Sequence, residues 1–169
     1  MAKGKGKGRG RGERDRGERG EARELALMAL CHLESYDAFE RDDALAIFWE
    51  NPPGVGQEGA PAIEAWSAKT GVRAFAERLL AVLGAAGGRT DEVIEATSRR
   101  WRVARMDRID RNILRLVVAE LEAVPETPRG VVLAEAVRLA ARYGGERSAP
   151  FVNGLAESLA RRLRPAAQR

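Results

Sequence analysis

Positively charged side chains are concentrated at the start of the chain. Residues 1–20 contain eight lysines or arginines and three acidic residues. Each cation can neutralise a phosphate group and release its counterions, which gives salt-dependent binding to nucleic acid without reading the base sequence. The pattern favours an anionic partner, most often nucleic acid; the alternative is an extension that only improves solubility. The candidate phosphate-binding side chains in this stretch are Lys3, Lys5, Lys7, Arg9, Arg11, Arg14 and Arg16.

The basic charge belongs to this stretch and not to the whole chain. Residues 1–20 carry +5, whereas the complete chain of 169 residues carries +4. Glycine alternating with lysine or arginine cannot form an apolar core or an apolar helix face, so we predict a disordered arm over residues 1–20. A second basic cluster lies further along the chain and consists of Arg99, Arg100, Arg102 and Arg105.

Catalytic constellations are not evident. Cys31 and His32 are adjacent, but neighbouring residues of a helix point about 100° apart and do not face each other. We therefore interpret them as a packed thiol and a surface imidazole. One cysteine and one histidine, without a cluster of acids or hydroxyls at catalytic spacing, argue against an enzyme. No metal or other cofactor is expected, because a single cysteine supplies neither a disulfide framework nor a cysteine-built metal site.

The elements that position these side chains are predicted to be helices. Hydrophobic residues make up 44% of the chain and charged residues 32%, with alanine, leucine, arginine and glutamate prominent, a composition that favours helix. The most central helix is expected over residues 107–121, because DRIDRNILRLVVAEL is apolar around most of its girth after a charged first turn. Arg115 lies inside that apolar run, and such an arginine must reach water or a carboxylate.

The same periodicity predicts about seven helices in a compact all-α bundle. No apolar run is long enough to span a bilayer, and no apolar segment follows the basic start, so the cytoplasm is the expected compartment. The predicted domains are the arm at residues 1–20, a helical domain at 21–165 and a tail at 166–169. The expected helices cover residues 21–36, 42–49, 72–83, 90–101, 107–121, 129–143 and 149–163.

Three motifs in a fixed order resemble the C-terminal half of the NusB family. They are RMDRIDRNILRLVVAEL at 105–121, EAVRLAARYGG at 135–145 and SAPFVNGLAESLAR at 148–161. The stretch EARELALMAL at 21–30 also resembles the opening helix of the family. The resemblance implies an all-helical fold in two small sub-bundles. It further implies a transcription antitermination factor that binds boxA-type single-stranded RNA of ribosomal RNA transcripts with the ribosomal protein NusE, within the RNA polymerase antitermination complex.

The resemblance also assigns individual residues. Arg19 and Arg23 match family arginines at the start of the first helix and are expected to contact RNA. The remaining matches to family motifs, expected to be mainly structural, are Arg111, Arg115, Glu135, Phe151, Asn153 and Gly154. We expect Arg115 and Glu135 to form a half-buried ion pair between two helices, Phe151 to belong to the core, and Asn153 and Gly154 to serve packing and hydrogen bonding.

Several family positions differ here, which leaves alternatives open. The family asparagine before Glu135 is Ala134, a common aromatic of the first helix is Cys31, and the tyrosine before Glu120 is Ala119. One alternative is an RNA-targeting module that acts with a separate ribosomal RNA methyltransferase. Another is a divergent protein-interaction module that has lost RNA binding. The free protein is expected to be a monomer or a homodimer.

Overall fold

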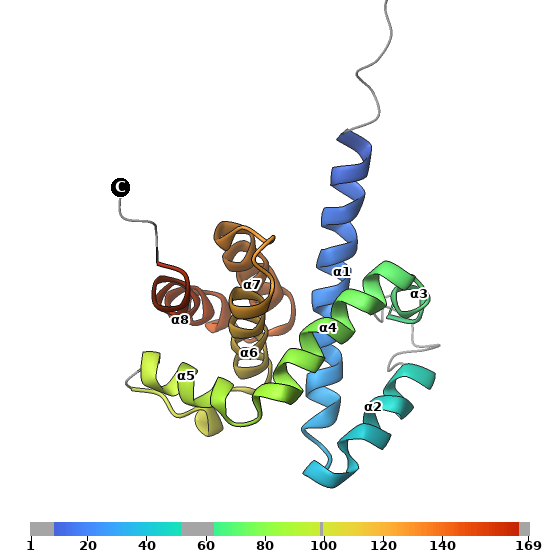
Figure 1. Cartoon of the computed structure of the whole chain (residues 1–169). Helices are drawn as coiled ribbons and strands as arrows, with labels where there is room; N and C mark the ends of the chain where they lie inside the picture. The colour runs from blue at the N-terminus through green and yellow to red at the C-terminus, as the bar shows by residue number, and fades with distance from the viewer. Residues whose placement is uncertain (1–8, 52–62, 99, 166–169) are drawn as a thin grey trace, which may run out of the picture.

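The computed structural model describes residues 9–51, 63–98 and 100–165, and these residues form a helical bundle without strands (Figure 1). This confirms the all-α prediction. Two short 3₁₀ segments, Ala38–Glu40 and Val103–Arg105, precede α2 and α6. The α-helices are α1 (Arg9–Leu33), α2 (Arg41–Glu50), α3 (Ile63–Ser67), α4 (Thr70–Ala86), α5 (Arg89–Ser98), α6 (Arg108–Ala123), α7 (Arg129–Tyr143) and α8 (Ser148–Leu163).

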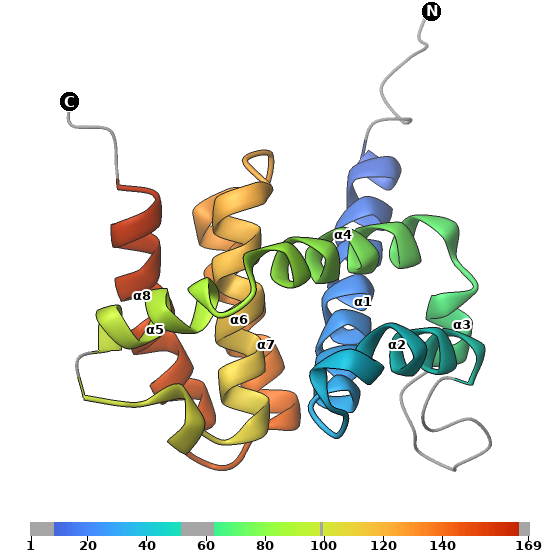
Figure 2. The same ribbon diagram turned by 60° about the horizontal axis from the view of Figure 1, so that its bottom comes forward.

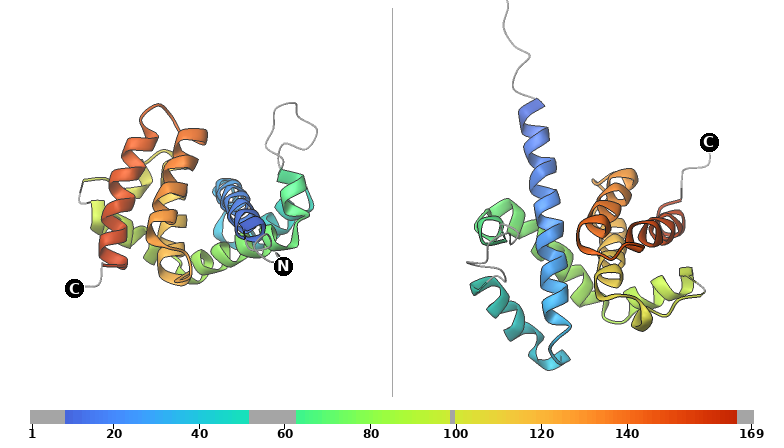
Figure 3. Two further views of the ribbon diagram at one scale, coloured as in Figure 1. Left: turned by 90° about the horizontal axis from the view of Figure 1, so that it is seen from above. Right: turned by 180° about the vertical axis from the view of Figure 1, so that it is seen from behind.

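The helices form two groups that share one core. Helix α1 packs against α2, α3 and α4, while α6, α7 and α8 pack against one another with α5 alongside (Figure 2). Contacts of α6 with α1 and α4 join the two groups. Seen from above and from behind, α1 and α8 lie on opposite sides of the α6–α7 pair (Figure 3). The arrangement agrees with the two sub-bundles implied by the family resemblance.

Helix α6 is the central element, as its sequence predicts. Most of its residues are buried, and it contacts α1, α4, α5, α7 and α8. Apolar side chains such as Ile113, Leu114 and Val117 cover several faces of the helix, so it can bury surface against neighbours on several sides at once. Three polar side chains of α6, Asp110, Asn112 and Glu120, are nevertheless buried.

Helix α1 begins earlier than predicted. It starts at Arg9, so residues 9–20, expected to be disordered, are helical, while residues 1–8 of the predicted arm lie outside the described residues. Once a helix is nucleated by packing, each further residue adds a hydrogen bond at low entropic cost. The packed segment from Ala22 to Ala29 supplies that nucleus. Gly17 and Gly20 each cost about 1 kcal/mol relative to alanine, which the elongated helix tolerates.

The link between α4 and α5 depends on a glycine. Gly87 ends α4 with φ = +55°, a left-handed conformation that is unfavourable for residues with a Cβ. Helix α4 continues past the predicted end at residue 83 and includes Gly84, and α5 begins at Arg89, one residue before its predicted start. Among the described residues, no helix is long and apolar enough to cross a membrane.

Candidate nucleic-acid interface

The predicted phosphate-binding residues fall into two groups at the N-terminus. Lys3, Lys5 and Lys7 lie outside the described residues. Arg9, Arg11, Arg14 and Arg16 lie on the N-terminal turns of α1, and Figure 1 shows this part of the helix extending past the other helices. The helical backbone therefore places four of the predicted cations on a projecting element.

Arg19 joins α1 to two other elements. Its Nη1 donates a hydrogen bond to Oγ1 of Thr127 at 3.1 Å, in the link before α7. Its guanidinium also lies 5.0 Å from the ring centre of Phe75 on α4, within the range of a cation–π contact. Arg19 is half-buried. Its side chain therefore fixes the start of the packed segment of α1 against Thr127 and Phe75.

Arg23 lies in the interior and not on the surface. Its Nε and Nη2 donate to the two carboxylate oxygens of Glu120 at 2.8 and 2.5 Å. The two side chains are only 4% and 2% exposed. Nη1 of Arg23 also lies 3.7 Å from Oε2 of Glu135. This arginine, matched to an RNA-binding position of the family, is enclosed by protein groups and presents no donor to an external phosphate.

The expected Arg115–Glu135 pair is wrong. Arg115 instead donates from Nε and Nη2 to Asp91 at 2.7 Å each, and from Nη1 to Glu34 at 2.7 Å. The hydrogen bonds to Asp91 raise the pKa of Arg115 above its ordinary value, and the hydrogen bond to Glu34 adds to the effect. The guanidinium therefore ties α6 to α5 and to the C-terminal end of α1.

Helix geometry explains the exchange of partners. Arg111 and Arg115 are four residues apart and share one face of α6, and both bind Glu34. Arg111 donates from Nε and Nη2 at 2.7 and 2.6 Å. Glu135 lies on α7 and forms its closer ion pair with Arg138 at 3.0 Å. Periodicity could identify the face that carries Arg115 but not which helix would cover it.

The second basic cluster surrounds an exposed aromatic side chain. Arg99 lies outside the described residues, whereas Arg100, Arg102 and Arg105 are exposed. Trp101 is 53% exposed and meets the ring of Phe151 on α8 edge-on, at 5.9 Å between ring centres. Trp101 is thus held against Phe151 and is still half exposed, with arginines next to it in the sequence.

Trp101 is held in place through its backbone and its neighbours. The Ser98 hydroxyl donates to the carbonyl oxygen of Trp101 at 2.7 Å. Arg102, 75% exposed, donates from Nη1 to Oε2 of Glu95 at 2.8 Å, and this bond lowers the pKa of the Glu95 carboxyl. A hollow of about 410 Å³ lies beside Trp101 over the surface of α5. The sequence predicts a helix over residues 90–101, but α5 ends at Ser98, so Trp101 lies outside it and is exposed. The arginines on both sides of Trp101 in the sequence were a signal of this exposure.

The FVNG motif on α8 is divided between the core and the surface. Phe151 packs against the core as expected. Asn153 and Gly154 are exposed, and a Cβ added at Gly154 would meet nothing within 4 Å. The packing part of the expectation for both residues is therefore wrong, because Val152 and Leu155 are the residues that turn inward. The carbonyl oxygen of Gly154 does accept a hydrogen bond from the Ser158 hydroxyl at 3.0 Å.

Cys31 and His32 occupy separate environments on α1. The Cys31 sulfur accepts a hydrogen bond from Nδ2 of Asn112 at 3.6 Å, and burial raises the pKa of its thiol. His32 lies 3.2 Å from the carbonyl oxygen of Ala44 and beside the Phe48 ring. Cys31 is a packed thiol, as predicted. His32 is half-buried among protein groups, so the prediction of a surface imidazole is wrong. In the part of the chain that the structure describes, no group of three or more His, Cys, Asp or Glu could hold a metal ion.

Comparisons with known proteins agree with this fold and its motifs. Transcription antitermination protein NusB of Sorangium cellulosum is 42% identical over 147 residues, covering 87% of this chain and 94% of that protein. The NusB protein of Myxococcus xanthus is 37% identical, covering 85% and 95% of the two chains. A solved structure of T. maritima NusB superposes with a TM-score of 0.67 at 25% identity, covering 85% of this chain and 90% of that one.

A family-level match covers most of the chain. The model of the NusB family matches residues 20–161, which include every described helix at least in part. The relatives named above are transcription antitermination proteins. From the helical architecture, the ordered C-terminal motifs and these matches together, it follows that the chain belongs to the NusB family of transcription antitermination proteins.

Proposed function

We propose that this chain binds boxA-type single-stranded RNA of ribosomal RNA transcripts together with the ribosomal protein NusE, within the RNA polymerase antitermination complex. Membership of the NusB family supports a role in transcription antitermination. We propose, beyond that role, which RNA and which partner the chain binds and which residues contact them.

The observation that carries the proposal is the exposed Trp101 between exposed arginines. Single-stranded RNA presents unstacked bases, and proteins bind them by stacking on aromatic rings and guanidinium planes. The contact with Phe151 holds the indole in place, and 53% of Trp101 remains exposed to a base. Arg100 and Arg105, both exposed, would then contact the phosphates on either side of a base stacked on Trp101.

The N-terminal cations would supply a separate, electrostatic contribution. Those on the first turns of α1, from Arg9 to Arg16, project from the bundle and would neutralise phosphates without reading sequence. Arg23 is not part of the proposed surface, because its guanidinium is enclosed by Glu120 and Phe75. In this proposal Trp101 determines base stacking, whereas the N-terminal segment determines most of the salt dependence.

The test compares a boxA RNA with a scrambled RNA across a salt series, with and without NusE from the same organism. We expect preference for boxA, strengthened by NusE. Trp101→Ala should weaken boxA binding about fivefold to 150-fold, since base–aromatic stacking contributes about 1–3 kcal/mol per base. Phe39→Ala is the matched control, because Phe39 is an 83% exposed aromatic on a different element.

Other outcomes would contradict the proposal in distinguishable ways. Equal, steeply salt-dependent binding to both RNAs without an effect of NusE would indicate a general polyanion binder. NusE binding without boxA preference would indicate a protein-interaction module. Stable copurification with a ribosomal RNA methyltransferase would favour the methyltransferase alternative instead.

A further inference from the structure

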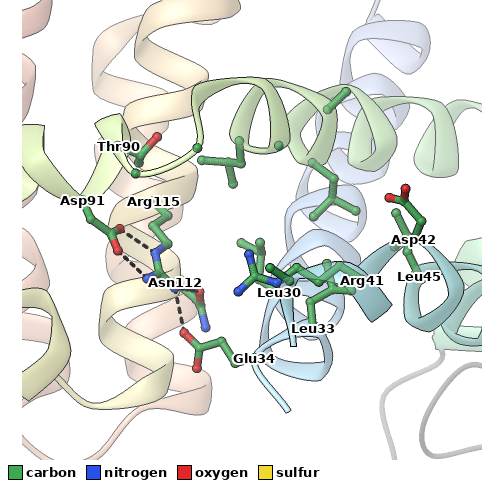
Figure 4. Close-up of a pocket in the computed structure, with 17 residues that line it drawn as sticks. Leu30, Leu33, Glu34, Arg41, Asp42, Leu45, Thr90, Asp91, Asn112 and Arg115 are labelled. Carbon is green, nitrogen blue, oxygen red and sulfur yellow. Dashed lines mark hydrogen bonds and ion pairs between the residues drawn. The ribbon is translucent and has the colours of Figure 1, made fainter. Parts of the chain in front are cut away.

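A hollow of about 660 Å³ lies where the C-terminal ends of α1 and α4 meet α2, α5 and α6 (Figure 4). One wall is apolar and is built from half-buried leucines of α1, α2 and α4, namely Leu30, Leu33, Leu45 and Leu83. The volume is typical of a small-molecule site, which usually combines an apolar lining with a few convergent polar groups.

The polar end of the hollow contains two arginines, of which one is paired with carboxylates and the other is not. Arg115 is saturated by Asp91 and Glu34. Arg41, by contrast, is exposed and has no hydrogen bond or ion pair within the described ranges. Figure 4 shows its side chain running past Leu33 toward Leu30, whereas the carboxylate of Asp42 lies at the other end of the hollow, near Leu45. An unneutralised cation therefore lies over the apolar wall.

A glycine keeps the hollow open. Gly84 lies inside α4 and lines the hollow, and glycine in a helix interior is less stable than alanine. Its backbone does not require glycine, because the positive φ in this region belongs to Gly87. A Cβ added at Gly84 would meet nothing within 4 Å. Neither backbone conformation nor close packing explains this residue, and it lines the hollow without contributing a side chain.

We propose that this hollow binds an apolar organic anion. Its apolar body would cover the leucine wall and remove that surface from water, while its carboxylate, sulfonate or phosphate would pair with the Arg41 guanidinium. Charge complementarity favours an anion at the Arg41 end, because the carboxylates Glu34 and Asp91 are already bound by Arg115, while the Asp42 carboxylate lies at the other end of the hollow. Gly84 provides the space for the apolar body.

The test uses 8-anilinonaphthalene-1-sulfonate, an aromatic body with one anionic group, titrated into the folded protein and followed by fluorescence. We expect one saturable site per chain. Gly84→Leu should weaken binding at least tenfold without lowering the melting temperature. Gly154→Leu is the matched control, because Gly154 is also a helical glycine whose added Cβ would meet nothing within 4 Å. If Gly84→Leu does not fold, Ala81→Leu places the obstruction on the same wall.

A neutral probe separates the charge from the apolar wall. Arg41→Gln should weaken binding of the sulfonate at least fivefold and leave binding of neutral N-phenyl-1-naphthylamine unchanged. Gly84→Leu should weaken binding of both probes. The proposal is overturned if the sulfonate does not bind, if it binds at several equivalent sites, or if Gly84→Leu and Gly154→Leu bind it as tightly as the unmodified protein does.

Discussion

The guanidinium of Arg23 and the carboxylate of Glu120 meet inside the molecule through two parallel hydrogen bonds, although 97 residues separate them in sequence. The pair links α1 to the central helix α6. Two charges removed from water are stable only when each satisfies the other, and here the forked guanidinium matches both carboxylate oxygens.

Arg23→Ala should therefore lower stability, because it leaves Glu120 buried without its counter-charge. We expect a loss of about 3–5 kcal/mol in the free energy of unfolding, measured by urea denaturation. Arg161→Ala is the matched control: Arg161 pairs with Glu157 on the exposed surface of α8, where such pairs contribute less than about 1 kcal/mol. Equal stability of the two variants would refute an interior role for Arg23.

A second prediction concerns the partners of Arg115, whose coupling to it can be measured by double-mutant cycles. Arg115→Ala should cost about 2 kcal/mol, in the range for hydrogen bonds to charged groups. Combined with Asp91→Ala, its effect should be non-additive by more than about 0.5 kcal/mol, because the two side chains are in contact. Combined with Glu135→Ala, the effects should add. Coupling of Arg115 to Glu135 in place of Asp91 would contradict the observed pairing.

These pairings mark the limit of what the sequence could predict. Apolar periodicity identified α6 and its inward residues, because burial leaves a 3.6-residue pattern in the chain itself. It could not assign Arg115 to Asp91 or Arg23 to Glu120, because the crossing of helices decides which charged faces meet. The start of α1 at Arg9 was missed for a related reason. Residues 9–20 have no apolar face, and their helix continues from packing that begins further along α1.

Exposure was the other feature that sequence could not determine. Trp101 and Leu155 both follow apolar spacing, yet only Leu155 is buried. Asn153 and Gly154 belong to a motif whose neighbours are in the core, and they nevertheless lie on the outer face of α8. Trp101 lies beyond the end of α5 at Ser98, so helical spacing does not fix its direction. On α8, the neighbouring helices decide which residues face inward.

The environment of the Glu34 carboxyl leads to a prediction of how the free energy of unfolding changes at acidic pH. Burial raises the pKa of its carboxyl, but hydrogen bonds from Arg111 and Arg115 outweigh burial and hold the pKa below the ordinary 4.5. A carboxyl whose pKa is lower in the folded than in the unfolded state stabilises the fold at pH values above its unfolded-state pKa. This stabilisation is lost as the pH falls through the folded-state pKa.

We therefore expect the free energy of unfolding to decrease more steeply between about pH 5 and pH 3 in the unmodified protein than in Glu34→Gln. Urea denaturation at several pH values measures both slopes. Glu77→Gln serves as the control, since Glu77 belongs to an exposed pair. Identical slopes for the unmodified protein and Glu34→Gln would contradict the role assigned to the Glu34 carboxylate.

Arg164 follows the last helix, α8, and we expect its side chain to stabilise the central helix α6. Its guanidinium donates to the carbonyl oxygens of Leu121 at 2.5 Å, Glu120 at 2.7 Å and Val124 at 2.8 Å. The last carbonyl groups of a helix have no partners within it, so this side chain satisfies the C-terminal end of α6 from outside. It also donates to Thr127, in the link to α7.

Arg164→Ala should therefore cost about 2–3 kcal/mol in urea denaturation, because several partly buried carbonyl groups lose charged donors. Arg164→Lys should recover only part of this loss, since an ammonium group cannot reproduce the planar fork. Arg161→Ala is the control on the same helix: Arg161 is exposed and pairs only with neighbours of α8. Hydrogen exchange should locate the effect at the end of α6, because the amides there lose protection when the carbonyl groups that close the helix lose their donors.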